Sequence, residues 1–233
     1  MKILAIDVGG TGLKAALIDG NGKLVSARQR IGTPSPCPPK VMVPALLELV
    51  APLKGYSKIS IGFPGVVRGL KVITAPHFGN EVWAGFDLGG TLAKKLKKPV
   101  RMINDAEMQG LAVIKGKGLE MVITLGTGFG SALFDHGELA PHMELAHHPI
   151  HGNKTYNEYL GDHELKKIGK HKWNKRVKDI IDILHTLLNY DHLYIGGGNA
   201  KKIEFKLPKH VSTVSNDAGM EGGAKLWKLK DRR

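Results

Sequence analysis

Cysteine is nearly absent from this chain of 233 residues, because Cys37 is the only one. One thiol can form neither a disulfide within the chain nor a thiolate metal cluster, and a reducing cytoplasm is the location that we expect. Long apolar runs are missing as well, since none approaches the roughly 20 residues that a membrane helix needs. A strand pattern follows Met1 directly, so we expect no cleavable leader and no membrane partner.

Acidic residues are too few to balance the basic ones. The chain has 34 Lys and Arg against 21 Asp and Glu, a formal net charge of +13. Such an excess favours polyanionic partners such as nucleic acid, an acidic surface or a phosphate polymer. Basic residues gather in 94–98, 166–178 and 225–233, although each cluster alone is also typical of a solvated helix face. Few aromatic residues lie among them and no nucleic-acid module is recognisable, so we expect no nucleic-acid partner.

The hydrophobic pattern predicts two halves that open alike. An expected strand over 2–8 leads through a glycine turn to a second strand over 13–18. The hairpin signal Asp19-Gly20-Asn21-Gly22 then predicts a third strand over 24–30. The second half also opens with a strand, a glycine turn and a strand. Other strands are expected over 58–63, 99–103, 120–125, 131–134, 193–195 and 212–214, and helices over 41–53, 87–97, 106–113, 173–189 and 217–228.

A polar corner joins one of these strands to a helix at Asn104-Asp105. Asn and Asp favour helix N-caps, because their side chains accept the unpaired amide protons of the first turn. A carboxylate at such a corner is also well placed to act as a base at the floor of a cleft. Taken alone, the corner is better explained as a cap.

Two glycine turns between strands, Gly9–Gly12 and Gly126–Gly130, expose backbone N–H groups that suit a phosphate anion. Neither turn is a P-loop, and neither is a dinucleotide fingerprint, because a strand and not a helix follows each. One such turn alone is better read as a simple tight turn. Two turns together with Gly196-Gly197-Gly198 favour phosphate binding.

The order of these motifs resembles that of the actin-like ATPase superfamily and, within it, the ROK family of sugar kinases. The segments that carry the resemblance are Asp7–Lys14, Gly62–Gly65, Asn104–Ala106, Glu144–His147, Leu125–Ser131 and Ile195–Gly198. The sequence is most similar to the bacterial polyphosphate glucokinases, which lack the cysteine-rich zinc motif of most ROK members. His148-Pro149-Ile150 follow the Glu144–His147 signature without a cysteine, so we expect no structural zinc.

The resemblance implies an α/β actin-like ATPase (ribonuclease H-like) fold of two lobes with a central cleft. The first lobe would span 1–104 and the second 105–233, with a last helix over about 217–229 that packs back toward the first lobe. The resemblance also implies a homodimer. The implied reaction transfers a terminal phosphoryl group from polyphosphate, ATP or both to the 6-hydroxyl of glucose or a related hexose, with Mg²⁺ as cofactor.

Site roles follow from the same resemblance. Asp105 would be the general base that takes the hydroxyl proton. Sugar contacts are implied for Gly65, Asn104, Glu144, His147 and Glu158. Phosphate or nucleotide contacts are implied for Asp7, which would also hold Mg²⁺ through water, and for Gly9, Gly10, Thr11, Gly12, Lys14, Gly126, Thr127, Gly128, Gly130, Gly197 and Gly198.

Three positions depart from the family pattern. Ala146 stands where glycine is usual, His77 where asparagine is frequent, and Asn157 where a sugar-binding glutamate is common. Glu158 is the nearest replacement, but one residue further along a helix points elsewhere. These departures leave open a kinase for another hexose or an N-acetyl sugar.

Two further alternatives remain. A non-catalytic actin-like regulator or filament subunit would need the phosphate turns but not Asn104-Asp105 with Glu144 and His147. The histidines between His142 and His163 also suggest zinc, which we disfavour because no cysteine or paired metal motif accompanies them.

Overall fold

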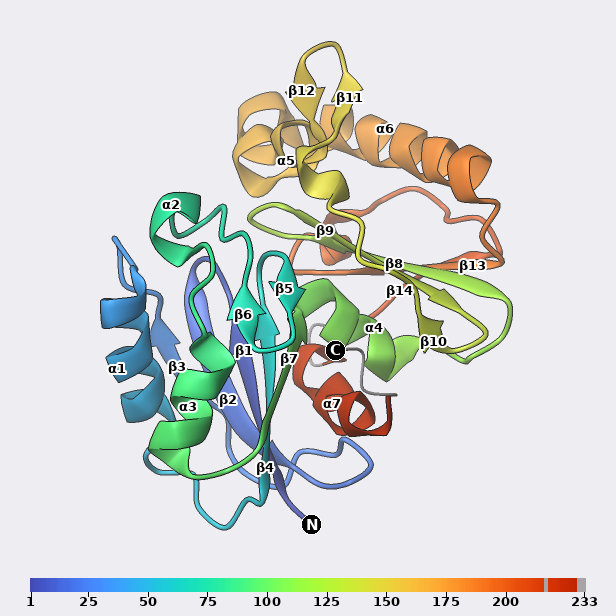
Figure 1. Cartoon of the computed structure of the whole chain (residues 1–233). Coiled ribbons are helices and arrows are strands. Elements are labelled where there is room, and N and C mark those ends of the chain that lie inside the picture. Colours follow the sequence, from blue (N-terminus) through green and yellow to red (C-terminus); the bar gives the residue numbers. More distant parts are fainter. Residues whose placement is uncertain (216–217, 230–233) are drawn as a thin grey trace. The chain divides into compact units, whose positions relative to one another are not determined.

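The computed structural model describes residues 1–215 and 218–229 (Figure 1). The chain forms two compact units: Met1–Ala112 together with 218–229, and 113–215. The lobe boundary expected after Asn104 stays a prediction, and Asp217, the expected start of the last helix, lies outside the described residues. None of the helices within the described ranges has the length and apolar character to cross a membrane.

A mixed five-stranded sheet is the centre of the first unit, with the strand order β3-β2-β1-β4-β7. The strands are β1 (Ile3–Val8), β2 (Gly12–Ile18), β3 (Gln29–Gly32), β4 (Lys58–Phe63) and β7 (Val100–Asn104). β1, β2 and β3 pair antiparallel, whereas β1, β4 and β7 run parallel. The carboxyl ends of three parallel strands therefore meet at one edge.

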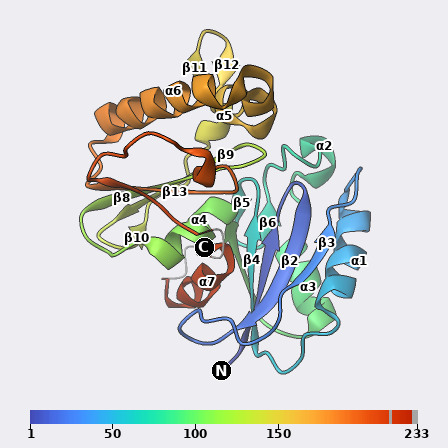
Figure 2. The same ribbon diagram turned by 180° about the vertical axis from the view of Figure 1, so that it is seen from behind.

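Helices cover both faces of this sheet because β1 is apolar on both sides. Leu4 and Ile6 pack in one core with residues of α1 (Pro39–Val50) and α3 (Leu88–Leu96). Ile3 and Ala5 pack on the opposite face, against Met220 and Ala224 of α7. The views from front and back show α7 (Ala218–Lys225) across the sheet from α1 and α3 (Figures 1 and 2). Short elements complete the unit: β5 (Val67–Arg68), β6 (Lys71–Val72), α2 (Asn80–Trp83), α4 (Asp105–Val113) and the 3₁₀ turn η3 (Leu226–Lys228).

The second unit has a sheet of the same plan, in the order β10-β9-β8-β13-β14. Its strands are β8 (Leu119–Leu125), β9 (Phe129–Asp135), β10 (Glu138–Leu139), β13 (His192–Gly196) and β14 (Val211–Thr213). Val177, Ile181 and Leu184 of α6 (Asp162–Leu188) share a core with Met121 and Ile123 of β8. Short elements are η1 (Leu145–His147), β11 (Pro149–His151), β12 (Lys154–Thr155), α5 (Tyr156–Leu160) and η2 (Ala200–Lys202).

The two sheets repeat one topology. Each begins with an antiparallel pair joined by a glycine turn, and the first strand of that pair then takes a parallel neighbour later in the chain. This repetition confirms the prediction of two halves that open alike, and the mixture of helices and mixed sheets confirms the α/β class.

Three sequence-based element boundaries are wrong. The helix expected over 41–53 is Pro39–Val50. The third strand, expected over 24–30, is Gln29–Gly32, and Leu24 makes only an isolated bridge with Ile18. The reason is a side chain: Ser26 Oγ accepts the N–H of Leu17 at 2.8 Å and displaces the regular ladder. The helix expected over 173–189 begins at Asp162 and contains a non-helical residue, Gly169, with φ of 79°.

Candidate active site

Asp7 stands near the end of β1 and is held by a cross-strand partner. Lys14 lies directly opposite it on β2, and Lys14 Nζ approaches Asp7 Oδ2 to 3.0 Å. Both side chains remain partly exposed. The pair places a carboxylate and an ammonium group beside the glycine turn that joins the two strands.

The hydrogen bonds of the first glycine turn fix the direction of one of its amides. Gly9 N–H donates to Gly12 O at 3.1 Å, and Gly9 O accepts the Thr33 hydroxyl at 2.7 Å. The C=O and the following N–H of a trans peptide point in opposite directions, so the N–H of Gly10 points away from Thr33. A Cβ on Gly9 would lie 2.8 Å from Gly12 O, and this closeness requires glycine. Thr11 is exposed at the tip, and the turn offers donors to an anion.

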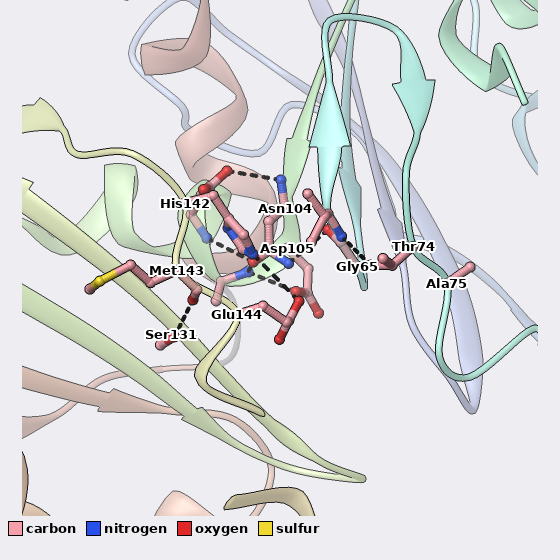
Figure 3. A network of polar contacts seen from close by, with 12 residues as sticks. Gly65, Thr74, Ala75, Asn104, Asp105, Ser131, His142, Met143 and Glu144 are labelled. Carbon is pink, nitrogen blue, oxygen red and sulfur yellow. Dashed lines mark hydrogen bonds and ion pairs between the residues drawn. The ribbon is translucent and has the colours of Figure 1, made fainter. Parts of the chain in front are cut away.

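Asn104, the last residue of β7, caps α4. Its Oδ1 accepts the N–H of Ala106 at 2.8 Å, and Glu107 Oε2 accepts the N–H of Asn104 at 3.1 Å. Asn104 Nδ2 donates to Gly65 O at 3.1 Å (Figure 3). The buried side chain therefore joins the helix start to the turn after β4, which confirms the cap interpretation for this residue.

Asp105 begins α4, and its position depends on a glycine in the neighbouring strand. Asp105 is partly buried, and its Oδ1 accepts the N–H of Ala106 at 2.8 Å. A Cβ on Gly62 would lie 3.4 Å from Asp105 Cα and 2.8 Å from Met108 Cε. The absence of a side chain at Gly62 thus lets β4 approach the helix start closely.

Gly65 is required by the chain itself. A Cβ at this position would overlap the carbonyl oxygen of Thr74, whose hydroxyl accepts the N–H of Val66 at 3.0 Å (Figure 3). Its own carbonyl binds Asn104. The structure therefore assigns Gly65 a positioning role, and its expected approach to a sugar stays a prediction.

The second glycine turn has the same design as the first. Gly126 N–H donates to Gly128 O at 3.0 Å, and Gly126 O accepts Asp162 N–H at 3.0 Å and Asn199 Nδ2 at 3.2 Å. The N–H of Thr127 consequently points away from these two donors. Gly130 already lies in β9.

Asn157 supports the far end of this turn. Its Oδ1 accepts the N–H of Phe129 at 2.6 Å. A Cβ on Gly161 would lie 2.8 Å from Thr127 O, so the α5–α6 junction packs directly against the turn. Asn157 was named from the sequence only as a departure from the family pattern, and this contact was missed because its partner is 28 residues away and no local pattern signals it.

The expected adenosine motif lies against the same turn. Gly197 has φ of +85°, and a Cβ there would overlap the backbone of Leu125. Asn199 N–H donates to Leu125 O at 2.9 Å, while Gly198 is exposed. The structure therefore brings together the second phosphate turn and the Gly197 turn.

The segment that carries Glu144 and His147 is tied to β9. Ser131 Oγ donates to Met143 O at 3.1 Å (Figure 3). Glu144 Oε2 lies 3.4 Å from His142 Nε2, and 28% of the Glu144 side chain is exposed. Buried Ala146 anchors the short turn η1, and His147 is exposed.

Glu158 is engaged in a capping box at the start of α5. Its Oε2 accepts the N–H of Thr155 at 2.9 Å and the Thr155 hydroxyl at 3.0 Å. These hydrogen bonds lower the pKa of Glu158, and Lys154 and His147 contribute to the shift. The sugar contact expected for Glu158 stays a prediction.

Metal-ligating side chains do not gather in the described parts of either unit. Among residues 1–215 and 218–229, no group of three or more His, Cys, Asp or Glu side chains is arranged to hold an ion.

Comparison with known proteins agrees with these motifs. The model of the ROK family matches residues 3–150. Polyphosphate glucokinase from Mycobacterium tuberculosis (strain CDC 1551 / Oshkosh) is 29% identical over 235 residues, which cover 94% of this chain and 88% of that protein. N-acetylmannosamine kinase from Shigella flexneri is 36% identical over 146 residues, 60% of this chain and 49% of that protein.

A solved structure resembles almost the whole chain. The inorganic polyphosphate/ATP-glucomannokinase from Arthrobacter sp. strain KM superimposes with a TM-score of 0.88 at 28% identity, covering 97% of this chain and 98% of that one. These similarities confirm the resemblance to the ROK family and the actin-like ATPase fold.

Proposed function

The chain belongs to the ROK family, and we propose that it transfers the terminal phosphoryl group of polyphosphate or ATP to the 6-hydroxyl of glucose. It is a phosphotransferase with an alcohol group as acceptor, as its relatives are. The finer proposal concerns which donor, which sugar and which residues take part.

One observation in the first unit carries the proposal. The Gly9–Gly12 turn and the Asn104-Asp105 corner both lie at the carboxyl ends of parallel strands of one sheet, with β4 between β1 and β7. Neighbouring strands lie about 4.8 Å apart, so the turn and the corner are separated by roughly 10 Å. This separation suits a phosphoryl group at the turn and a sugar hydroxyl at the corner, and ligands of open α/β sheets bind at such an edge.

Asp105 acts as the general base in this proposal. Its carboxylate takes the proton of the 6-hydroxyl while the hydroxyl oxygen forms a bond to the terminal phosphorus. The bond from that phosphorus to the bridging oxygen breaks, and the shortened donor leaves with its electron pair. The N–H groups of Gly10 and Thr127 stabilise phosphate oxygens. The carbonyls of the same two peptide groups, Gly9 O and Gly126 O, already accept hydrogen bonds from Thr33 and Asp162, and this fixes the direction of the N–H groups. Phosphoryl transfer asks the protein mainly for such positioning and charge neutralisation.

Asp7 fits the magnesium ion that the family implies. Mg²⁺ is usually bound by one or two carboxylates together with substrate phosphates and water, and Asp7 supplies one partly exposed carboxylate beside the phosphate turn. When bound, the ion neutralises charge on the phosphates. Lys14 contributes a second positive charge at the same place, 3.0 Å from Asp7.

The donor proposal draws on charge and on the relatives. A formal net charge of +13 favours a polyanionic donor, and the Mycobacterium and Arthrobacter relatives are both named for polyphosphate. ATP is the second donor, because Gly197 and Gly198 adjoin the phosphate turn where an adenosine motif is expected.

The sugar proposal assigns Asn104, Glu144 and His147 to hydroxyl groups of glucose. The alternative acceptor is another hexose or an N-acetyl sugar, which Asn157 favours: it binds the backbone of Phe129 where many family members have a sugar-binding glutamate. The homodimer and the cytoplasmic location stay predictions.

The test is an assay of glucose 6-phosphate formation by the purified full chain. ATP and long-chain polyphosphate are supplied in parallel, each with Mg²⁺, and mannose and N-acetylmannosamine replace glucose in matched reactions. Glucose should give the highest kcat/KM. If an N-acetyl sugar is phosphorylated and glucose is not, the N-acetyl sugar is the acceptor. If no sugar is phosphorylated with either donor, the proposal is refuted.

A further inference from the structure

Two lysines contact one aspartate, Asp162, which is itself hydrogen-bonded to the second phosphate turn. Lys166 Nζ is 2.6 Å and Lys202 Nζ is 3.6 Å from the carboxylate of Asp162. The backbone N–H of Asp162 donates to Gly126 O at 3.0 Å. Asp162 therefore holds two ammonium groups with its side chain and the turn with its backbone N–H.

We propose that Lys166 and Lys202 form a subsite for the part of a polyphosphate chain that lies behind its terminal phosphoryl group. The inference rests on the proposed function and names two residues that would favour polyphosphate over ATP as the donor. All of its residues belong to the second unit.

The local charge supports an anionic ligand. Two ammonium groups share one carboxylate, so the cluster of Asp162, Lys166 and Lys202 keeps one net positive charge. The hydrogen bond from Lys166 lowers the pKa of Asp162 despite its partial burial, with smaller contributions from Asn199 and Lys202. The carboxylate consequently stays ionised at neutral pH and continues to hold both lysines.

Lys166 and Asp162 form an ordinary i,i+4 ion pair of α6, which by itself stabilises the helix only slightly. The side chain of Lys166 is 76% exposed, and exposed ion pairs contribute little to folding because water and salt screen them. Asn199 strengthens the link to the turn instead, since its Nδ2 lies 3.4 Å from Asp162 Oδ1 and 3.2 Å from Gly126 O. The contacts of the cluster thus converge on the phosphate turn.

The positive field continues along α6. Residues 162–178 contain seven Lys and Arg against two Asp and Glu. One of the two acids, Glu164, is already paired with Lys154 and Arg176. A long polyanion would therefore meet further positive charge beyond the lysine pair.

The pair should distinguish polyphosphate from ATP. Behind its phosphates ATP carries an uncharged adenosine, whereas every further unit of polyphosphate adds an anionic phosphate. Lys binds phosphate as a point charge with three donors. Both donors gain from the N–H groups of the turn, but only the polymer places additional anions at Lys166 and Lys202.

The experiment compares the double variant Lys166→Gln/Lys202→Gln with wild type as full chains. Binding of fluorescently labelled long-chain polyphosphate is measured without sugar, and kcat/KM for polyphosphate and for ATP is measured with glucose. Loss of two charge-assisted contacts should weaken polyphosphate binding by about tenfold or more. The ratio of kcat/KM for ATP to kcat/KM for polyphosphate should rise by about the same factor.

Two matched variants act as controls. Lys167→Gln removes the exposed neighbouring lysine on the same helix, which is one charge of the wider field, so it should weaken polyphosphate binding by only about twofold. Lys166→Arg/Lys202→Arg keeps both charges, so it should bind polyphosphate within about threefold of wild type. Equal losses for both donors, or a loss in Lys167→Gln as large as in the double variant, would overturn the subsite.

The two arms separate this inference from the proposed function. If wild type phosphorylates glucose and the double variant binds polyphosphate like wild type, the subsite is wrong and the function stands. If wild type phosphorylates no sugar with either donor but the double variant loses polyphosphate binding, the function is wrong and the subsite stands.

Discussion

The side-chain amide of Asn104 donates a hydrogen bond of 3.1 Å to the carbonyl oxygen of Gly65. This bond joins the corner between β7 and α4 to the turn that follows β4. Because Asn104 Oδ1 also accepts the N–H of Ala106, one buried side chain sets both the start of the helix and the position of the turn. The proposed base, Asp105, is the next residue, so its placement depends on this link.

Replacing Asn104 should separate its two structural contributions. Asn104→Ala removes the cap and leaves Gly65 O without its donor, and it should lower the free energy of unfolding by about 2–4 kcal/mol. Asn104→Ser keeps a capping oxygen and should lose about 1–2 kcal/mol. Urea denaturation of both variants measures the two effects. Wild-type stability in Asn104→Ala would show that the bonds seen at the corner contribute nothing to folding.

Replacement by alanine should affect stability differently at two glycines of the second unit, Gly126 and Gly197. A Cβ on Gly126 meets nothing within 4 Å, so the free energy of unfolding of Gly126→Ala should lie within about 0.5 kcal/mol of the wild-type value. The added methyl group would stand at the proposed phosphate site, and we expect a higher KM for the donor. Gly197→Ala combines φ of +85° with an overlap against Leu125 and should lose about 1–3 kcal/mol of stability. Denaturation curves and donor KM values measure the two effects. Equal losses of stability in the two variants would contradict the prediction.

Acid should weaken the second unit through Glu120. Burial alone would raise the pKa of this carboxyl, but N–H donors from Lys115, Gly116 and Lys117 and the hydroxyl of Tyr194 outweigh burial and lower it. A carboxyl whose pKa is lower in the folded state stabilises the protein above its ordinary value of 4.5, and the contribution disappears as pH falls through the lower folded value.

Glu120→Gln should therefore destabilise the protein most at neutral pH, by about 1–3 kcal/mol, because the new amide group faces N–H donors. The difference from wild type should shrink as pH falls below 4.5, the ordinary pKa. Urea denaturation at pH 7 and pH 3.5 measures it, and Glu138→Gln at an exposed position of β10 is the matched control. A difference that is the same at both pH values would contradict the role of the charged carboxylate.

The sequence predicted the parts of the fold that local patterns determine. The apolar strands β1 and β2 and the glycine turns after Val8 and Leu125 all appear where they were expected. The start of α6 was missed because residues 162–172 contain only two large apolar side chains, Leu165 and Ile168, and therefore show little apolar periodicity. The hydrogen bond that the backbone N–H of Leu17 donates to Ser26 Oγ could not be predicted either, because it competes with a strand pattern that is otherwise favourable.

The candidate site was predicted where a motif carries it and missed where distant contacts do. Asn104 and the two glycine turns were identified from short motifs. Asn157 and Asp162, which hold the second turn, act over 28 and 36 residues, respectively, and no spacing in the sequence announces them. Such positioning residues become visible only when the backbone of the turn and its donors are placed in space.

The most direct test of the proposed mechanism is the turnover of Asp105→Asn. Asparagine has nearly the same shape as aspartate but cannot take the hydroxyl proton, so glucose 6-phosphate formation should fall by a factor of about 10²–10⁴ with either donor. Glucose binding, measured by calorimetry on the same preparation, should stay within about threefold of wild type, because no contact of Asn104 is removed. Wild-type turnover in Asp105→Asn would contradict the assignment of Asp105 as the general base.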